Sequence, residues 1–397
     1  MRGQRICHIL GAGQWQVPTI AVARSLGYRT FVSDIYPDRP GYAHADEHAV
    51  MDIRDEQGTL LLAEQHRIDG IICDTTDAGV PTMAFVAERL GLPGIGYETA
   101  LNFTNKYRMR ALTSAAGVPN PPFRLVRALS AVRSAAADIG FPCVVKPVDN
   151  QSSRGVHVVR TPSDLDVAYA DALRFTRSAE VLVEGFLGGV EVTVESMCVD
   201  GEVLAIGISD KDHFAHRPEV AKRLTYPADL PAEVMERIRA INATVVCTLG
   251  MKTGITHAEY IVVNGQPYLV EIAARGAGSR VYSHIVPYLA GSLIPEMYLK
   301  FLMGDSPALP ARPPARAANL AFFGGMAGLV KSIHGVEQAL QLPGVQEILL
   351  EFQVGDSIEL PADDRSRPGL VVVFGKSRGE VLRITEEVFR TVQVGIE

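Results

Sequence analysis

Short apolar runs and helical stretches alternate along the first hundred residues, and this alternation constrains the fold more than any other feature of the sequence. Apolar runs at 6–10, 30–33 and 69–73 are each followed by residues with helical spacing, as at 18–26 and 80–90. The pattern predicts a parallel sheet whose faces are covered by helices. With 397 residues the chain is too long for one ordinary core, so we expect two or three lobes.

The first apolar run ends in Gly11-Ala12-Gly13, which predicts a tight turn from a strand into a helix. A dinucleotide-binding loop has a third glycine where this chain has Gln16, although Asp34 does follow the second apolar run. A nicotinamide cofactor is therefore not favoured. The turn either only redirects the chain or faces a substrate at the carboxyl edge of the sheet, where ligands of open α/β sheets bind.

From residue 141 onward, apolar runs follow one another as hairpins. They lie at 143–146, 156–159, 181–184, 190–199 and 203–208. Successive strands of this kind predict antiparallel α+β structure.

The remaining strands and helices follow after residue 230. A helix is predicted at about 232–249, and strands at 256–263 and 267–272. A stretch rich in proline and alanine, 307–318, leads into a last region. That region has predicted strands near 319–323, 347–351 and 370–374 and a final helix at 377–391.

The composition argues against several kinds of partner. The net charge is -7 with both signs interspersed, so we expect no nucleic-acid partner. No apolar stretch is long enough to span a membrane, and the apolar run behind the basic residues 1–5 is too short for a signal peptide. The five cysteines include no CxxC pair, and we expect reduced, buried thiols of a cytoplasmic protein.

Two glutamates, Glu259 and Glu271, each interrupt an otherwise apolar strand. A carboxylate in the middle of such a strand is costly to bury unless it is paired or bound to a metal. Magnesium commonly takes one or two protein carboxylates together with phosphates and water. The two residues therefore either form a magnesium site or include a surface glutamate paired with a lysine.

The register of the hairpin decides whether these two carboxylates can meet, since a slip of one residue moves a side chain to the other face. A two-residue Asn264-Gly265 loop pairs Glu259 with Val270, whereas a three-residue loop pairs Glu259 with Glu271. The metal hypothesis therefore predicts a three-residue turn, or a bulge, with Gly265 in the left-handed region.

Lys146 ends an apolar strand, and residues 149–155 behind it form a loop rich in small and hydroxyl side chains. A lysine in this place suits a phosphate as a point charge, and such a loop can bring backbone N–H groups onto a polyphosphate and close as a lid. The loop does not match the GxxxxGK[ST] pattern, because a strand rather than a helix follows it. The alternative is an exposed hairpin loop.

Two further stretches carry candidate binding groups. The strand 181–184 ends in Glu184-Gly185, a step whose backbone groups can bind an adenine, and Glu191 can accept from ribose hydroxyls. Arg275 follows Glu271 closely, and its guanidinium fork suits an anionic intermediate or a substrate carboxylate. The alternatives are an ordinary core strand and a structural arginine paired with a helix terminus.

The order of these features resembles the ATP-grasp superfamily, in particular L-amino-acid ligases and the formate-dependent purine transformylase. The resemblance rests on Lys106, on Lys146 with its loop, on the strand ending in Glu184, and on the two glutamates followed by Arg275. It covers nearly the whole chain and implies an α/β and α+β multidomain fold.

The implied domains are three. A pre-ATP-grasp, Rossmann-like lobe with a parallel sheet spans 1–105, and an ATP-grasp fold of two α+β subdomains spans 106–305 with a lid subdomain at about 115–185. Residues 306–397 are expected to form a C-terminal closing subdomain.

The resemblance also implies a role for each candidate residue. Those expected to bind ATP are Lys106, Lys146, Ser152, Ser153, Arg154, Gly155, Glu184, Gly185, Phe186, Leu187 and Glu191. Glu259 and Glu271 are expected to bind Mg²⁺, with Mn²⁺ as an alternative, and Arg275 and Lys146 are expected to be catalytic. Many family members have asparagine where this chain has Ala273, so the number of metal ions stays open.

The activity implied by the resemblance is that of an ATP-dependent carboxylate–amine ligase, which forms an amide bond through an acyl-phosphate. We expect an amino acid or a similar small carboxylate as substrate, and a homodimer. The candidate substrate residues are Trp15, Asp77, Lys211, His213 and Arg280. The segment 211–217 either faces the substrate or is a solvated loop. The alternatives are a purine-pathway transformylase or carboxylase-like enzyme and a nucleotide-binding protein without ligase activity.

Overall fold

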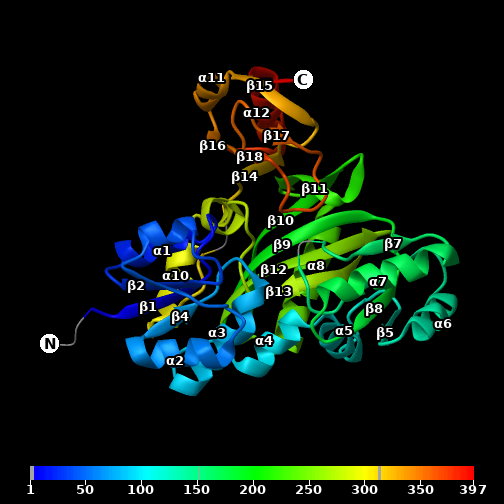
Figure 1. Ribbon diagram of the computed structural model, residues 1–397, viewed down its shortest axis with the longest axis horizontal. Coiled ribbons are helices and arrows are strands. Elements are labelled where there is room, and N and C mark those ends of the chain that lie inside the picture. Colours follow the sequence, from blue (N-terminus) through cyan, green and yellow to red (C-terminus); the bar gives the residue numbers. More distant parts are fainter. Residues whose placement is uncertain (1–3, 152, 312–313) are drawn as a thin grey trace.

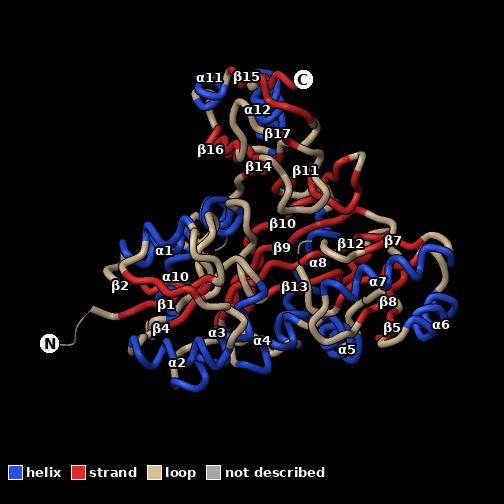
Figure 2. The backbone as a smooth tube through the Cα atoms, in the orientation of Figure 1, coloured by secondary structure: helices blue, strands red, loops and turns tan. Residues whose placement is uncertain are grey.

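The computed structural model describes residues 4–151, 153–311 and 314–397. Two lobes lie side by side with a third part above them (Figure 1), and helices and strands are mixed in every part (Figure 2). One sheet is parallel and the others are antiparallel. The predicted fold class, α/β structure followed by α+β structure, is confirmed.

A four-stranded parallel sheet forms the N-terminal lobe, in the order β3-β2-β1-β4. Its strands are β1 (Ile6–Leu10), β2 (Arg29–Asp34), β3 (Glu47–Val50) and β4 (Gly70–Ile72). The surrounding helices are α1 (Val17–Ser25), α2 (Glu56–His66), α3 (Val80–Leu90) and, from far along the chain, α10 (Ile294–Leu302). The sequence pattern does not reveal β3, because Glu-His-Ala-Val contains no apolar run.

A four-stranded antiparallel sheet forms the second lobe, which we call the lid, in the order β5-β8-β6-β7. Its strands are β5 (Phe123–Val126), β6 (Cys143–Pro147), β7 (His157–Val159) and β8 (Val181–Gly185), and its helices are α6 (Leu129–Ile139) and α7 (Leu165–Phe175). Their buried side chains, among them Val132, Val145 and Tyr169, form a core of their own. A separate core lets such a unit move as a body relative to the rest of the chain.

An eight-stranded antiparallel sheet forms the centre of the molecule, in the order β13-β12-β9-β10-β11-β14-β18-β16. The strands are β9 (Val190–Val199), β10 (Glu202–Phe214), β11 (Arg217–Tyr226), β12 (Gly254–Val263), β13 (Gln266–Ala273), β14 (Ala317–Phe322), β16 (Val345–Leu350) and β18 (Gly369–Gly375). The pairing of β11 with β14 continues the sheet across the expected boundary at 305. Residues 211–214 belong to β10 and Arg217 begins β11, so the interpretation of 211–217 as a solvated loop holds only for the exposed turn at 215–216.

The remaining elements connect these sheets. They are α4 (Tyr97–Thr104), α5 (Lys106–Ala115), α8 (Ala232–Thr248), α9 (Val286–Ala290), α11 (Val336–Leu340), α12 (Arg378–Thr391), β15 (Gly328–His334), β17 (Ser357–Ile358) and β19 (Gln393–Ile396), with short helical turns η1 (Pro40–His44), η2 (Asp77–Gly79), η3 (Pro162–Asp164) and η4 (Val281–Ile285). Within the described residues, no helix is both long and apolar enough to cross a membrane.

One hydrophobic core joins the N-terminal lobe to the central sheet. Leu10 and Met83 of the lobe belong to the same buried cluster as Tyr260 and Leu269 of β12 and β13. Burial of such side chains contributes about 1.5–3 kcal/mol each, so the two parts form one stable base on which the lid rests. All five cysteines are free and four are buried, whereas Cys247 on α8 is exposed, contrary to the expectation.

Asp74 follows β4 at the carboxyl edge of the parallel sheet and is fully buried. Its carboxylate accepts hydrogen bonds from the hydroxyls of Thr19 and Thr75. Burial raises the pKa of Asp74 to about 6, and these hydrogen bonds oppose the shift only in part. The Asp74 carbonyl accepts from the Gly276 N–H at 2.9 Å, so Asp74 also connects this edge to the residues after β13.

We expect Asp74 to lower the stability of the protein as the pH rises through its folded pKa. Both states are protonated below about pH 4, but above about pH 6 the folded state holds a buried charge that costs roughly 3 kcal/mol. The free energy of unfolding of Asp74→Asn, measured with urea, should therefore rise relative to that of wild type as the pH is raised from about 4 to about 7. The exposed Asp38 supplies the control, Asp38→Asn. A difference between Asp74→Asn and wild type that does not vary with pH contradicts this prediction.

Candidate active site

A cavity of about 360 Å³ lies between the lid and the central sheet. Strands β6 and β8 of the lid line one side, and β12 and β13 line the other. Nearly all of the predicted nucleotide and metal residues that the structure describes line this cavity, the exception being Gly155. Ser152, also expected at the nucleotide, lies outside the described residues.

Glu259 and Glu271 lie directly opposite each other on β12 and β13, as the metal hypothesis requires. The turn between the strands has two residues, Asn264 and Gly265, both left-handed with φ of 50° and 76°. The three-residue turn is therefore wrong, and the alternative, a bulge with Gly265 in the left-handed region, is confirmed. A bulge corrects the register instead, because the partner of Tyr260 is Leu269 and Val270 stands without a partner.

A lysine contacts each of the two carboxylates. Lys211 Nζ lies 2.8 Å from Glu259 Oε1 and also contacts Glu191, and Lys106 Nζ lies 2.9 Å from Glu271 Oε1. The two glutamate side chains retain 27% and 28% of their exposure, so both can still be reached from the cavity. Both glutamates are therefore paired with a lysine, as the alternative interpretation required of one of them. Both pairs, however, lie at the wall of a cavity and not on the outer surface.

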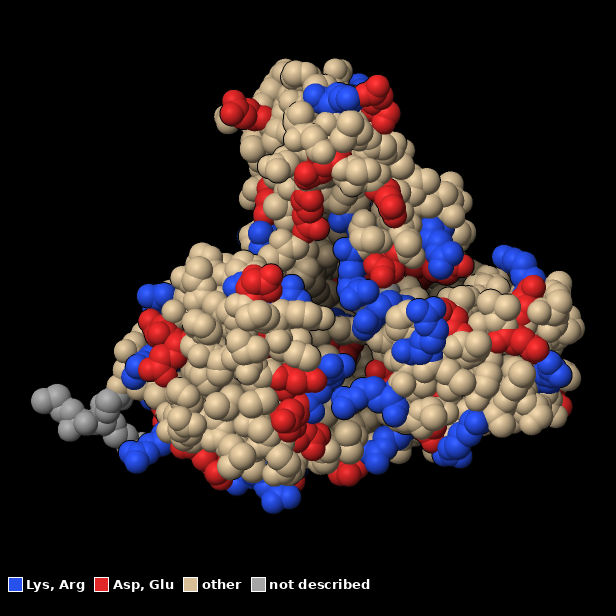
Figure 3. All heavy atoms as spheres, in the orientation of Figure 1, with Lys and Arg blue, Asp and Glu red and all other residues tan. Residues whose placement is uncertain are grey.

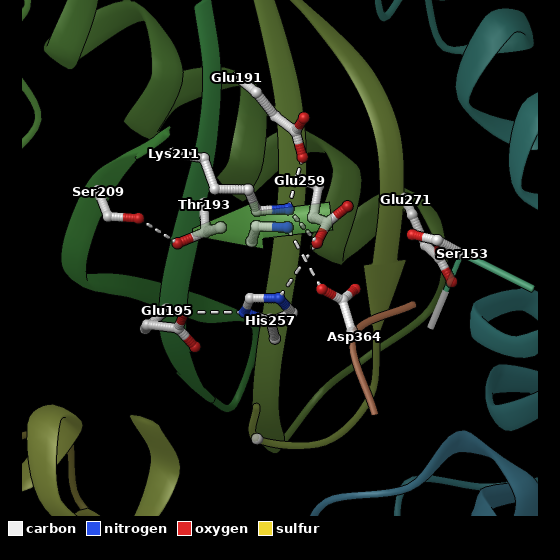
Figure 4. A network of polar contacts seen from close by, with 12 residues as sticks. Ser153, Glu191, Thr193, Glu195, Ser209, Lys211, His257, Glu259, Glu271 and Asp364 are labelled. Atoms are coloured by element: carbon white, nitrogen blue, oxygen red, sulfur yellow. Dashed lines mark hydrogen bonds and ion pairs between the residues drawn. The ribbon is translucent and has the colours of Figure 1, made fainter. Parts of the chain in front are cut away.

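A second cation, His257, backs Glu259 from within the sheet (Figure 4). His257 Nδ1 lies 2.8 Å from Glu195 and its Nε2 lies 3.6 Å from Glu259. Burial lowers the pKa of His257, but the two carboxylates outweigh it and raise the pKa to about 9. Burial likewise opposes ionisation of Glu259, yet Lys211 and His257 together hold the pKa of that carboxyl well below its usual range.

Lys146 belongs to a buried trio of charges with Glu184 and Arg110. Glu184 Oε2 lies 2.6 Å from Lys146 Nζ, and Glu184 Oε1 accepts from Arg110 Nε at 2.6 Å. Both oxygens of the Glu184 carboxylate are therefore already bound, one by Lys146 and one by Arg110, so the carboxylate is not free to bind an adenine base. The N–H groups of Gly185 and Phe186 donate to the carbonyls of Pro122 and Pro142, so neither of these two N–H groups is free to bind a base.

Residues 149–151 and 153–155, between β6 and β7, contact other parts of the molecule besides the lid. Gln151 accepts from the Asp77 N–H at 2.8 Å and donates to the Thr76 hydroxyl at 3.0 Å. Gly155 has φ of 72°, and a Cβ there would lie 2.8 Å from the ring of Phe175, so the loop requires glycine at this position. The contacts indicate a loop held against the N-terminal lobe rather than an open hairpin.

Arg275 lies at the edge of a second cavity, of about 540 Å³, which adjoins the first. Its guanidinium donates two hydrogen bonds of 2.9 Å to the Asp77 carboxylate. Both cavities share Arg275, Gln151 and the segment Gly278-Ser279 in their linings. Trp15 and the two glycines of the first turn line only the second cavity.

The predicted substrate residues do not gather in one place. Arg280 forms two hydrogen bonds of 2.7 Å with Glu347 and lies over the Trp15 ring at 5.4 Å. Lys211 lines the first cavity, and His213 contacts Glu191 at 3.0 Å. Trp15, Asp77 and Arg280 therefore lie toward the second cavity, while Lys211 and His213 lie on the side of the first.

Sequence reasoning missed several residues at this site. Arg110 lies one helical turn from Lys106, and His257 lies two residues from Glu259 on the same strand face, so spacing could have suggested both. Asp364 and Arg367 reach both cavities from the C-terminal part, and only the tertiary structure reveals them. Basic side chains gather around the central hollow where the three parts of the molecule meet (Figure 3).

Family models match two segments of the chain. Residues 139–283 match the ATP-grasp domain, and residues 322–397 match the L-amino acid ligase C-terminal domain 2. The crystal structure of L-amino acid ligase from Bacillus licheniformis superposes with a TM-score of 0.82 at 22% identity, covering 100% of both chains. The crystal structure of phosphoribosylglycinamide synthetase from Anaerococcus prevotii gives a TM-score of 0.80 at 17% identity, covering 99% of this chain and 100% of that one.

Two curated relatives match most of the chain. The uncharacterized protein y4rH of Sinorhizobium fredii is 29% identical over 79% of this chain, and the match spans 66% of that protein's length. The formate-dependent phosphoribosylglycinamide formyltransferase of Burkholderia thailandensis is 26% identical over 85% of this chain and 84% of its own. The domain matches and the shared fold confirm the resemblance: the chain contains an ATP-grasp domain at residues 139–283 and a C-terminal domain of the L-amino-acid-ligase type at residues 322–397.

Proposed function

We propose that this chain is an ATP-dependent carboxylate–amine ligase that joins an amino acid, or a similar small carboxylate, to an amine. One observation carries the proposal: Arg275 lines both of the adjoining cavities, so a single guanidinium borders the space for a nucleotide and the space for a second substrate. Its guanidinium fork already holds one carboxylate, that of Asp77. A substrate carboxylate has the same geometry and charge, and the phosphate oxygens of an acyl-phosphate can accept from the same pair of donors.

The first cavity suits ATP with a divalent cation. Lys106 and Lys146 supply positive charge for the phosphates, and Asn150, Gln151, Ser153 and Arg154 line the same cavity beside them. Glu259 and Glu271 offer oxygen ligands from facing positions on one wall, which fits magnesium. No group of three or more acidic, His or Cys side chains suited to a metal occurs among the described residues, and magnesium usually keeps phosphate and water ligands besides one or two carboxylates.

The second cavity suits a small molecule that carries both charges. Its lining combines the acidic Asp34, Asp52 and Glu351 with basic side chains such as Arg39 and Arg54. A volume of about 540 Å³ lies within the usual range for small-molecule sites. A free amino acid carries one ammonium and one carboxylate, so it can satisfy both kinds of group.

The chemistry would proceed in two steps. A carboxylate oxygen of the substrate attacks the γ-phosphorus of ATP, the bond from that phosphorus to the bridging oxygen breaks, and ADP leaves. The amine nitrogen then attacks the acyl carbon, the bond to phosphate breaks, and the amine gives up a proton. Lys146 and Arg275 would hold and neutralise the transferring group, while bound magnesium would shield the phosphate charges.

A purine-pathway enzyme is the second candidate. It is favoured by the similarity to a formate-dependent formyltransferase over most of both chains. The match of residues 322–397 to an L-amino acid ligase domain favours the amino-acid substrate instead. A nucleotide-binding protein without ligase activity is a third possibility, and the retained Lys146, Glu259 and Glu271 argue against it.

We expect ATP-dependent phosphate release only when a carboxylate and an amine are both supplied. A screen of amino acids in pairs, with product masses read directly, should yield ADP, phosphate and a mass equal to the two substrates less one water. Glu271→Gln should reduce the rate by at least about 100-fold, because the ion that balances the phosphate charge loses a ligand. Background ADP over a broad panel, with Glu271→Gln unchanged, contradicts the ligase proposal. Turnover with formate and a phosphoribosyl amine alone supports the purine alternative.

Arg275 should matter for turnover more than for nucleotide binding. In Arg275→Lys the bidentate fork is lost, so kcat should fall by about 100-fold while ADP affinity changes by less than about threefold. The matched control is Arg237→Lys, because Arg237 donates to the Gly265 carbonyl at an exposed position. Steady-state kinetics and ADP titration distinguish the two effects. A normal kcat in Arg275→Lys would refute this role.

A further inference from the structure

Arg110 is a fully buried arginine on α5. Its Nε donates to Glu184 Oε1 at 2.6 Å, and its Nη2 donates to the Val270 carbonyl at 2.7 Å. Its Nη1 has no hydrogen-bond partner within the part of the chain that the structure describes. A buried charge is costly unless it is well paired, so we expect the buried Arg110 to have a role that offsets this cost.

The contact with Glu184 sets the charge around Lys146. Lys146 and Glu184 alone would form a neutral pair, at 2.6 Å, and a neutral pair attracts a phosphate weakly. With Arg110 on the other carboxylate oxygen, the buried trio carries one net positive charge. The whole group lines the first cavity, where the effective dielectric constant is lower than in water and a net charge acts strongly.

The contact with Val270 secures the bulge in β13. Val270 is the extra residue that has no partner across the hairpin, and its insertion brings Glu259 opposite Glu271. Val270 and Glu271 both line the cavity, as expected when two successive residues face one partner. Without the bulge the two-residue turn would pair Glu259 with Val270, and Glu271 would move to the other face of the sheet.

We propose that Arg110 is a positioning residue that links the two halves of the nucleotide site. Its hydrogen bond to Glu184 gives the group around Lys146 a net positive charge. Its hydrogen bond to the Val270 carbonyl holds the bulge that aligns Glu259 with Glu271. The inference rests on the proposed function, because it takes the two glutamates as metal ligands. Lys106, on the same face one turn earlier, contacts Glu271 itself, so α5 acts on both successive residues of the bulge.

The two contacts can be separated by substitution. Lysine in Arg110→Lys keeps the positive charge and can reach Glu184, but a single ammonium lacks the fork that spans both Glu184 and the Val270 carbonyl. Methionine in Arg110→Met keeps most of the volume and loses both contacts. Arg108→Met is the matched control, since Arg108 lies on the same helix but pairs with Glu98 at the surface.

The test measures binding rather than turnover. Mn²⁺ binding at fixed ADP is followed by loss of the free Mn²⁺ electron paramagnetic resonance signal, and ADP binding in EDTA is followed by calorimetry. Arg110→Lys should raise the Mn²⁺ dissociation constant by roughly 10-fold while ADP binding in EDTA changes by less than about threefold. Arg110→Met should also weaken ADP binding in EDTA, by about 10-fold. Arg108→Met should match wild type in both.

A purely structural arginine predicts something different. It would lower the melting temperature of the Arg110 variants and leave both dissociation constants unchanged, and that result overturns the inference. If Arg110→Met fails to fold because Glu184 is left unpaired, the double variant Arg110→Met/Glu184→Gln removes that charge. The double variant still lacks the bond to Val270, so it should still bind Mn²⁺ weakly, and wild-type Mn²⁺ affinity there overturns the inference.

Glu271→Gln separates this inference from the function on which it rests. Weak Mn²⁺ binding by Glu271→Gln together with normal binding by Arg110→Lys overturns the role of Arg110 alone. Normal Mn²⁺ binding by Glu271→Gln overturns the metal role of the glutamates, and with it the part of the inference that concerns the bulge.

Discussion

Two carboxylates held opposite each other on neighbouring strands are the constraint on which the rest of this site depends. Glu259 and Glu271 would repel each other at a cavity wall if nothing balanced them. Lys211 and His257 offset the charge of Glu259, and Lys106 offsets that of Glu271. These three cations come from three separate elements, β10, β12 and α5. The site can therefore form only when the central sheet and α5 are packed together.

The division of the hydrophobic cores suits a site that must open and close. The N-terminal lobe and the central sheet share one core and form a single base, whereas the lid has its own core. The lid meets the base through polar contacts such as Gln151 with the Thr76 hydroxyl and Ser153 with the Glu219 carbonyl. Hydrogen bonds of this kind contribute about 1 kcal/mol each and can exchange for contacts with a ligand, whereas a shared core cannot separate at such low cost.

The sequence predicts much of the fold and of the carboxylate pair, and its failures have physical causes. Strong apolar runs reveal β14, β16 and β18, but β3, β17 and β19 are short or polar and form only because a neighbouring edge is available. The facing of Glu259 and Glu271 and the need for a three-residue turn or a bulge follow from the metal hypothesis, but the position of the bulge, at Val270, does not. The pairing of Arg275 with Asp77 joins residues 198 positions apart, and local pattern carries no signal for it.

The most direct test of the account is a crystal structure of the chain with ADP and Mg²⁺. We expect an ion with one oxygen of Glu259 and one of Glu271 among its ligands, each at about 2.0–2.1 Å, and with phosphate oxygens of ADP and water as the others. Lys106 and Lys211 should then have released the glutamates and turned to the phosphates or to neighbouring carboxylates. An ion bound elsewhere, with both lysines still on the glutamates, would contradict the central claim.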